Sequence, residues 1–232
     1  MTYKEKIVAA RFIDRPNRFI AHVEVDGEIL TVHVKNTGRC RELLVPNCKV
    51  YLAMSGSESR KTPADIIAVE KQTESGDSIL INMDSQVTNT VAEEWIRDSE
   101  VFSTTAIIKR EVCYGSSRFD IAVTDGDRRA FIEVKGVTLE NGGTVMFPDA
   151  PTERGIKHLD ELISCMRDGY EAYIIFVVQM KEATLFKPNK NTHPEFADKL
   201  SEASSTGVNV IAITTEVTPN TIKPFKKINI QL

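Results

Sequence analysis

Residues 117–138, SRFDIAVTDGDRRAFIEVKGVT, decide how the second half of this chain folds. Glu133 and Lys135 stand two residues apart in an otherwise apolar run, so a strand would place both side chains on one face. The turn signal Asp125-Gly126-Asp127 precedes that run, and an antiparallel hairpin about it would bring Asp120 beside Glu133. The stretch therefore predicts two carboxylates and an ammonium at one point.

Two carboxylates and an ammonium are suited to a site for a hard divalent cation. Mg²⁺ takes only one or two carboxylates from protein and completes its shell with water and phosphate. It activates water and neutralises charge on a phosphodiester, and Lys135 would then orient the water or stabilise the transition state. The alternative is a plain salt bridge between Lys135 and either carboxylate. Because unmatched charges are costly in an apolar strand, the sequence favours the metal site.

The rest of the second half alternates between helices and strands. A helix is predicted over 86–98, where Val87, Val91 and Trp95 share one face, and another over 152–168. The other predicted elements are strands at 106–114, 117–124, 130–138, 144–147, 173–178 and 208–214 and a helix near 194–204. The continuous apolar run 173–178 is typical of a central strand covered on both faces. This order predicts an α/β domain with a mixed central sheet.

The first half contains short strands and turns. The predicted strands are 5–14, 18–25, 28–35, 48–54, 65–71 and 77–83, with a short helical piece at 41–44. Asp26-Gly27 predicts a tight hairpin between the second and third strands, because both turn positions require positive φ. Six short strands with polar turns predict a small barrel or a sandwich. A domain boundary is expected near residue 83.

Composition excludes several classes of protein. The 232 residues carry 29 Lys+Arg and 33 Asp+Glu, a net charge of −4, which argues against a histone-like chain. No apolar run approaches the ~20 residues that span a bilayer, and no signal peptide is evident, so we expect a cytoplasmic protein without a membrane partner. The four cysteines form no C-x-x-C pair and predict neither zinc nor disulfides.

The charge is unevenly divided between the halves. Residues 1–82 carry 12 basic and 11 acidic groups, whereas residues 83–232 carry 17 and 22. Segment 35–61 holds six basic residues against two glutamates, which predicts a surface that contacts phosphate; a solvated rim of mixed charge is the alternative. Lys223, Lys226 and Lys227 near the end are expected to form a solvated tail.

Ten short stretches, in order along the chain, resemble the sugar fermentation stimulation protein A (SfsA) family. They are Asn36-Thr-Gly-Arg39, Glu42-Leu-Leu-Val-Pro46, Arg60-Lys-Thr-Pro63 with Asp65, Arg110-Glu-Val112 with Tyr114-Gly115, Ser117-Arg-Phe-Asp120, Glu133-Val-Lys135-Gly-Val-Thr138, Met146-Phe-Pro-Asp-Ala150, Thr152-Glu-Arg-Gly155, Lys157-His-Leu159 and Phe176-Val-Val-Gln179. The second half also resembles the PD-(D/E)xK nuclease superfamily, with Phe119 in place of the proline. Lys35 and Asn47 replace a Pro and a Gly that are usual in the SfsA family.

The resemblance implies an α/β (overall α+β) chain of two domains: an OB-like barrel over 1–83 that binds nucleic acid, and a restriction-endonuclease-like domain over 84–232. It implies DNA as partner, Mg²⁺ or Mn²⁺ at Asp120 and Glu133, and Lys135 as the third catalytic residue. Glu94, or its neighbour Glu93, is the candidate for a further acidic ligand on the first helix. The expected nucleic-acid contacts are Lys35, Asn36, Arg39, Arg41, Arg60, Lys61, Arg118, Arg154 and Lys157.

The sequence is compatible with two functions. One is a DNA-binding protein with a Mg²⁺-dependent phosphodiesterase site. The other is a DNA-binding transcriptional regulator without catalysis, which the family resemblance links to sugar (maltose) metabolism. No small-molecule cofactor is expected, and both a monomer and a homodimer are compatible with the sequence. A saccharide-binding barrel is the weakest reading, because the first half has no Trp to form a platform for a sugar.

Overall fold

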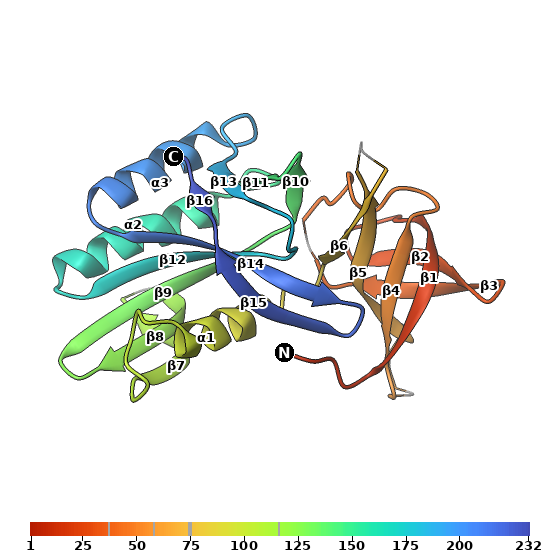
Figure 1. Cartoon of the computed structure of the whole chain (residues 1–232), viewed down its shortest axis with the longest axis horizontal. Helices are drawn as coiled ribbons and strands as arrows, with labels where there is room; N and C mark the ends of the chain where they lie inside the picture. Colours follow the sequence, from red (N-terminus) through yellow and green to blue (C-terminus); the bar gives the residue numbers. More distant parts are fainter. Residues whose placement is uncertain (37, 58, 74–75, 116) are drawn as a thin grey trace.

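The chain folds into a β-barrel and an α/β domain that lie side by side (Figure 1). The computed structural model describes residues 1–36, 38–57, 59–73, 76–115 and 117–232. Thr37, in the expected turn at 36–38, and Glu58, in the basic segment, lie outside the described residues. Among the described residues, none of the helices has both the length and the apolar character needed to cross a bilayer.

The N-terminal half forms a closed barrel, one of the two architectures that the pattern of short strands predicted and the one that the family resemblance implied. Its strands are β1 (Lys6–Asp14), β2 (Ile20–Val25), β3 (Glu28–Val34), β4 (Lys49–Met54), β5 (Ala64–Gln72) and β6 (Ser78–Asn82). They follow the order β3-β2-β1-β4-β5-β6, and a parallel pairing of β3 with β5 closes the ring. Closure removes the exposed edges that an open sheet would present. The resulting five-stranded barrel is OB-like, with β6 as an extension.

Two of the predicted turn conformations are present in the barrel, and one predicted element is not. Asp26 and Gly27 have φ of 51° and 86°, which is the paired positive φ of a primed hairpin turn. Asn47 has φ of 69°, so it adopts the left-handed backbone that its Gly-like position requires. The helix expected at 41–44 is wrong. That segment is a turn, closed by hydrogen bonds from the Leu43 and Leu44 amides to the Cys40 carbonyl, because Pro46 leaves no room for a second helical turn.

The C-terminal domain is built on a six-stranded mixed sheet in the order β15-β14-β12-β9-β8-β7. Its elements are β7 (Ile107–Tyr114), β8 (Ser117–Asp125), β9 (Arg128–Val137), β12 (Glu171–Val178), β14 (Asn209–Thr218) and β15 (Thr221–Lys227), with α1 (Thr88–Asp98), α2 (Glu153–Arg167) and α3 (Pro194–Ser205). Helix α1 packs on one face, where Trp95 is buried as predicted, and α2 and α3 lie on the other (Figure 1). The apolar strand β12 is central and runs parallel to both β9 and β14.

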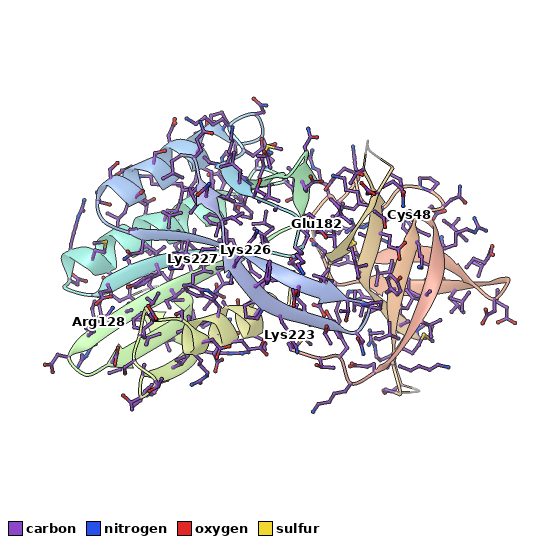
Figure 2. The ribbon with its side chains drawn as sticks, viewed as in Figure 1. Cys48, Arg128, Glu182, Lys223, Lys226 and Lys227 are labelled. Atoms are coloured by element: carbon purple, nitrogen blue, oxygen red, sulfur yellow. The ribbon has the colours of Figure 1, made fainter. Side chains whose placement is uncertain are left out.

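Four short or charged strands escaped the sequence prediction. A second sheet has the order β10-β11-β13-β16, of which only β11 (Thr144–Phe147) was expected; β10 (Leu139–Asn141), β13 (Leu185–Pro188) and β16 (Asn229–Ile230) were not. The expected solvated tail is also wrong, because Lys223, Lys226 and Lys227 lie on β15, an edge strand of the large sheet (Figure 2). Edge strands tolerate lysine and proline, which hide the strand pattern.

Candidate functional site

The hairpin of β8 and β9 brings the predicted site residues together. Ile121 pairs with Ile132 and Ala122 with Phe131, which is the register that the turn symmetry predicted. Asp120 and Glu133 therefore lie on neighbouring strands, close enough that the charge of Glu133 raises the pKa of Asp120. Lys135 follows two positions later on β9, and its Nζ donates to Glu133 Oε1 at 2.5 Å.

Glu133 is a buried carboxylate that is only partly satisfied. Its residue is 2% exposed, and Oε1 contacts both Lys135 and the Nδ1 of His158. Its other oxygen, Oε2, is buried and has no hydrogen-bond partner among the described residues. Burial alone would raise the pKa of Glu133, but the contacts with His158 and Lys135 lower it below the usual range. Glu133 is thus held as an anion with one oxygen unused.

His158 comes from helix α2, which begins against this cluster. The Thr152 hydroxyl caps the helix by accepting from the Gly155 amide at 3.0 Å. Two turns into the helix, His158 is 7% exposed, and its Nε2 accepts from Arg154 Nε at 3.2 Å. The ring proton is therefore assigned to Nδ1, which faces Glu133. We call Asp120, Glu133, Lys135 and His158 the carboxylate cluster.

Asp120 is oriented by two neutral donors. Its Oδ2 accepts from the Val134 amide at 2.9 Å and its Oδ1 from Asn89 Nδ2 at 3.0 Å. Burial is the largest cause that raises the pKa of Asp120, and the nearby charge of Glu133 adds to it. The ionised form of Asp120 is consequently disfavoured until a positive charge arrives.

The first helix reaches the carboxylate cluster through Asn89 rather than through its acidic residues. Glu94 accepts from the Met1 ammonium at 2.9 Å, and that ammonium also donates to the Ile222 carbonyl. Glu93 pairs with Arg97 and Arg110 on the surface. The structure thus places Glu94, the predicted third acidic ligand, beside the N-terminus, where the Met1 ammonium matches its charge.

The donor set of the cluster is compatible with Mg²⁺ or Mn²⁺. Among the described residues no three His, Cys, Asp or Glu side chains converge as a metal site made only from protein would require. Mg²⁺ sites use one or two carboxylates and leave the other positions to water and substrate phosphate. The unpartnered Oε2 of Glu133 and the disfavoured charge of Asp120 are what such a cation would relieve.

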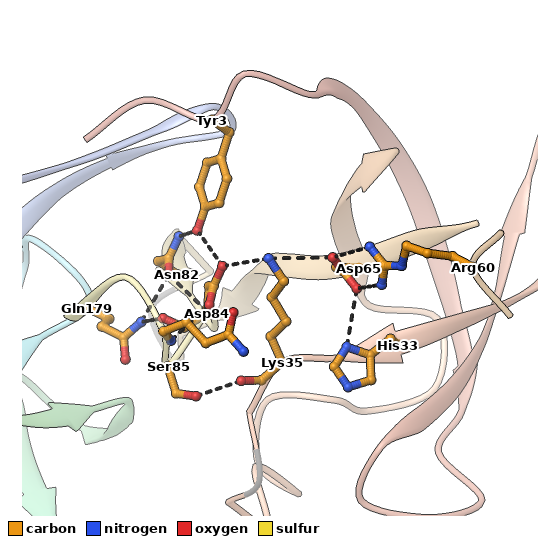
Figure 3. Close-up of polar contacts among 10 residues, drawn as sticks. Tyr3, His33, Lys35, Arg60, Asp65, Asn82, Asp84, Ser85 and Gln179 are labelled. Carbon is orange, nitrogen blue, oxygen red and sulfur yellow. Dashed lines mark hydrogen bonds and ion pairs between the residues drawn. The ribbon is translucent and has the colours of Figure 1, made fainter. Parts of the chain in front are cut away.

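Two of the predicted nucleic-acid contacts are used inside the molecule instead. Lys35 Nζ lies 3.2 Å from Asp84 Oδ2 and 3.4 Å from Asp65 Oδ2, and Arg60 makes a bidentate pair with Asp65 (Figure 3). Both Asp65 and Asp84 are buried. We call Lys35, Arg60, Asp65 and Asp84 the interdomain network, because Asp84 lies between the barrel and helix α1.

The interdomain network continues into the C-terminal domain through amide and hydroxyl groups. Gln179, at the end of β12, donates to Asn82 Oδ1 at 2.9 Å and to the Asp84 carbonyl at 3.1 Å, and Asn82 donates to the Tyr3 hydroxyl (Figure 3). Gly136, directly after Lys135, packs against Gln179, where a Cβ would lie 2.8 Å from Oε1. Burial is the main cause that raises the pKa of Tyr3, with Asp84 adding to it. This region fixes the barrel against the strand that carries the carboxylate cluster.

The remaining predicted contacts with nucleic acid on the barrel are exposed, apart from Asn36, which is half-buried. Arg39, Arg41 and Lys61 form no ion pair within the described residues. Asn36 accepts from the Gly38 amide at 2.8 Å, and the Arg39 amide donates to Asp149 at 2.9 Å, so this turn is held against the C-terminal domain. A side chain at Gly38 would collide with the Asp149 carboxylate. The basic turn is therefore in direct contact with the second domain.

Three more predicted residues lie on β8 and α2, two of the elements that carry the carboxylate cluster. Arg118 pairs with Glu111 at 3.1 Å, and Lys157 lies 3.7 Å from Glu161. Both side chains are 58% exposed, so these pairs are weak and exchange readily with another anion. Arg154 is exposed and touches the cluster directly through His158.

Sequence reasoning missed Asn89 and did not commit to His158. Both come from helices that are distant in sequence from the β8–β9 hairpin, so no local spacing links them to Asp120 or Glu133. The only available signals were a polar residue in the first turn of the helix at 86–98 and a histidine on the helix that follows Thr152.

The fold and these contacts define a class of two-domain protein: an OB-like closed barrel joined to a mixed α/β domain with a buried carboxylate cluster. Comparison with known families gives the particular family. A family model described as the SfsA N-terminal OB domain matches residues 13–81, and one described as the sugar fermentation stimulation protein RE domain matches residues 86–221. The chain belongs to the sugar fermentation stimulation protein (SfsA) family.

Relatives of known name cover the whole chain. A sugar fermentation stimulation protein homolog from Clostridium beijerinckii is 54% identical over 89% of both chains, and one from Ruminiclostridium cellulolyticum is 48% identical over 100% of both. A solved structure of Pyrococcus furiosus SfsA in complex with Ca²⁺ is 26% identical, covers 100% of both chains and has a TM-score of 0.84.

Proposed function

We propose that this protein binds DNA and carries a Mg²⁺-dependent phosphodiesterase site at the carboxylate cluster, in a domain resembling the PD-(D/E)xK nucleases. The observation that carries the proposal is the buried Oε2 of Glu133, which has no hydrogen-bond partner among the described residues. A bound cation would supply the partner that this oxygen lacks. The Ca²⁺ complex of the relative from Pyrococcus furiosus supports a divalent ion in this family.

In this proposal Asp120 and Glu133 would hold the ion, as Mg²⁺ or Mn²⁺. The chemistry that such an ion supplies is a lowered pKa for water and neutralisation of charge on a phosphodiester. Asn89 orients Asp120, and His158 orients Glu133 through Oε1. Lys135 leaves Glu133 Oε1 when substrate binds and donates to the attacking water or to the phosphate oxygens.

The barrel would supply the affinity for the DNA backbone. Arg39, Arg41 and Lys61 are exposed cations without an ion pair among the described residues. Arg118, Arg154 and Lys157 would add exposed positive charge on β8 and α2, which carry the carboxylate cluster. Contacts of this kind make affinity depend on salt, because each neutralised phosphate releases about one counterion. The net charge of −4 does not oppose this, since the local concentration of basic groups matters more than the sum, and basic groups outnumber acidic ones in segment 35–61.

Cleavage of labelled single- and double-stranded DNA and RNA tests the catalytic half. With Mg²⁺ or Mn²⁺ the wild type should cut at least one substrate, and EDTA should stop it. Glu133→Gln and Lys135→Ala should each lower the rate by about a hundredfold or more. Asp127→Asn and Lys190→Ala, at exposed positions away from the cluster, are the matched controls. A wild type that binds every substrate and cuts none would contradict the enzyme and leave a DNA-binding regulator.

Salt dependence tests the binding half. Arg39→Ala should weaken DNA affinity and reduce the slope of log Kd against log salt by about one. An unchanged slope would remove Arg39 from the phosphate-contacting surface.

A further inference from the structure

The barrel has a cavity that lies apart from the carboxylate cluster. It is about 690 Å³ in volume and opens between residues 12–18 at the end of β1 and residues 38–46, with Ala150 of the C-terminal domain at its edge. That volume falls within the range of ligand sites, which are typically 300–1,000 Å³.

The cavity is lined by a concentration of positive charge. Four arginines (Arg15, Arg18, Arg39 and Arg41) and one carboxylate, Asp14, border it. Asp14 is already engaged with His22 at 2.7 Å. Within the described ranges of the chain, Arg18, Arg39 and Arg41 form no ion pair, so their charge faces the cavity and solvent.

Arg15 gives the cavity a fixed shape. Its guanidinium donates to the carbonyls of Asn36, Gly38, Arg39 and Arg18 at 2.7–3.1 Å. These bonds hold the two loops together but do not neutralise the charge, because a carbonyl is not an anion. The Nε of Arg15 is buried and lacks a partner among the described residues. We call this the arginine cavity.

The floor of the arginine cavity is apolar. Phe12 and Cys40 are 1% exposed, and Leu44 is 8% exposed. Burial raises the pKa of the Cys40 thiol to about 12, so this group is a neutral part of the floor. A ligand that fits must therefore combine an anionic group for the arginines with an apolar or planar body for the floor.

We propose that the arginine cavity binds a nucleotide, with the phosphate on Arg18 and Arg41 and the base against the apolar floor. Guanidinium groups bind phosphate oxygens in bidentate fashion and stack on planar rings, so one residue type serves both parts of this ligand. The choice of a nucleotide among organic phosphates rests on the DNA binding of the proposed function. The shared chemistry has two sources, a free mononucleotide or the phosphorylated end of a strand.

The arginine cavity is connected to the carboxylate cluster through one short segment. Asp149 accepts from the Arg39 amide, Ala150 borders the cavity, and Thr152 caps α2. The same helix carries His158, which contacts Glu133. A nucleotide in the cavity therefore lies beside Ala150. The helix that begins three residues later positions His158 against Glu133.

Binding to the full chain in EDTA tests the proposal without cleavage. The soluble probes are AMP, adenosine and inorganic phosphate, measured by calorimetry. The strand probes are a short single-stranded DNA with a 5′-phosphate and the same strand with a 5′-hydroxyl, labelled at the 3′ end and measured by anisotropy. The test variant is the double substitution Arg18→Gln and Arg41→Gln, and Arg129→Gln, exposed on β9, is the matched control.

AMP should bind about tenfold or more tightly than adenosine or inorganic phosphate, and the double variant should lose about tenfold while Arg129→Gln stays at the wild-type value. A 5′-phosphate preference of similar size identifies the strand end as the ligand, whereas AMP binding without that preference identifies a free mononucleotide. Equal binding of AMP and adenosine, or an unaffected double variant, would overturn the proposal. If the nucleotide proposal is overturned and cleavage persists, the proposed function stands. If AMP binds as expected and no substrate is cut, the nucleotide site stands and the phosphodiesterase site is contradicted.

Discussion

The carboxylate cluster and the interdomain network each combine two acids with cationic partners, yet they differ in how completely the carboxylate oxygens are matched. In the network, Asp65 and Asp84 face Lys35 and Arg60, and all four carboxylate oxygens have partners. In the cluster, Glu133 Oε2 has none within the described residues, and Asp120 has only neutral donors.

The pKa directions separate Asp120 from Asp65, whereas the pKa of Glu133 is lowered like that of Asp65. Burial alone would raise the pKa of Asp65, but Arg60 and Lys35 lower it below the usual range. For Asp120, burial and the charge of Glu133 both act to raise the pKa. A fully matched network stabilises the fold. An unmatched cluster instead leaves negative charge uncompensated, and a bound cation can neutralise that charge. The comparison therefore separates a group of matched charges from one in which a buried carboxylate oxygen has no partner among the described residues.

The largest expected effect is the loss of stability when the interdomain network is broken. Asp65→Ala leaves Lys35 and Arg60 without their shared carboxylate, and the removal of one partner of a buried pair typically costs about 3 kcal/mol or more. Urea denaturation should show that decrease in the free energy of unfolding. Asp127→Ala, at an exposed turn position, is the control and should change it by less than about 0.5 kcal/mol. Equal stabilities of Asp65→Ala and the control would show that the network is not structural.

A substitution in the carboxylate cluster is expected to change the free energy of unfolding in the opposite direction when no metal is bound. Asp120→Asn removes a charge that the folded protein disfavours and keeps an acceptor for the Val134 amide. In EDTA we expect a gain of about 1 kcal/mol in the free energy of unfolding, together with loss of metal-dependent cleavage. Destabilisation by Asp120→Asn in EDTA would mean that the cluster is as well matched as the network.

The smallest expected effect is a difference between Asp120→Asn and Asp65→Asn in how the free energy of unfolding depends on pH. Because the pKa of Asp65 is lowered in the folded state, its contribution is present above the unfolded value near ~3.9 and is lost only as pH falls below it. Because the pKa of Asp120 is raised, its ionised form destabilises the fold at neutral pH, and this penalty disappears as pH falls towards ~3.9.

Urea denaturation between pH 7 and pH 3 in EDTA measures both differences. The gap between wild type and Asp120→Asn should close at a higher pH than the gap between wild type and Asp65→Asn. Closure in the reverse order would contradict the assignment of the two groups.

The sequence was sufficient to predict the part of the site that depends on local spacing. Asp120, Glu133 and Lys135 are brought together by one hairpin, and the symmetry of its turn was sufficient to predict their register. The short strands and the Asp26-Gly27 turn predicted a small barrel or a sandwich, and the family resemblance implied the barrel. For the hairpin the deciding interactions are between neighbours along the chain, whereas the barrel closes through the pairing of β3 with β5.

The rest depended on contacts between distant segments. Lys35 and Arg60 belong to a basic stretch of sequence, but Asp65 and Asp84 neutralise them only once the barrel has closed and packed on α1. Glu94 is matched by the amino terminus, 93 residues away. A count of charges along a segment therefore overestimates what remains available to a phosphate backbone.

The most direct test of the central claim, that Asp120 and Glu133 hold a divalent cation, is calorimetric titration of the metal-free full chain with Mn²⁺, Mg²⁺ and Ca²⁺. We expect wild-type protein to bind the ion, Glu133→Gln and Asp120→Asn each to weaken binding by about tenfold or more, and Asp65→Asn to leave binding unchanged. Equal binding by wild type and the two cluster variants, or no binding by wild type, would contradict that claim.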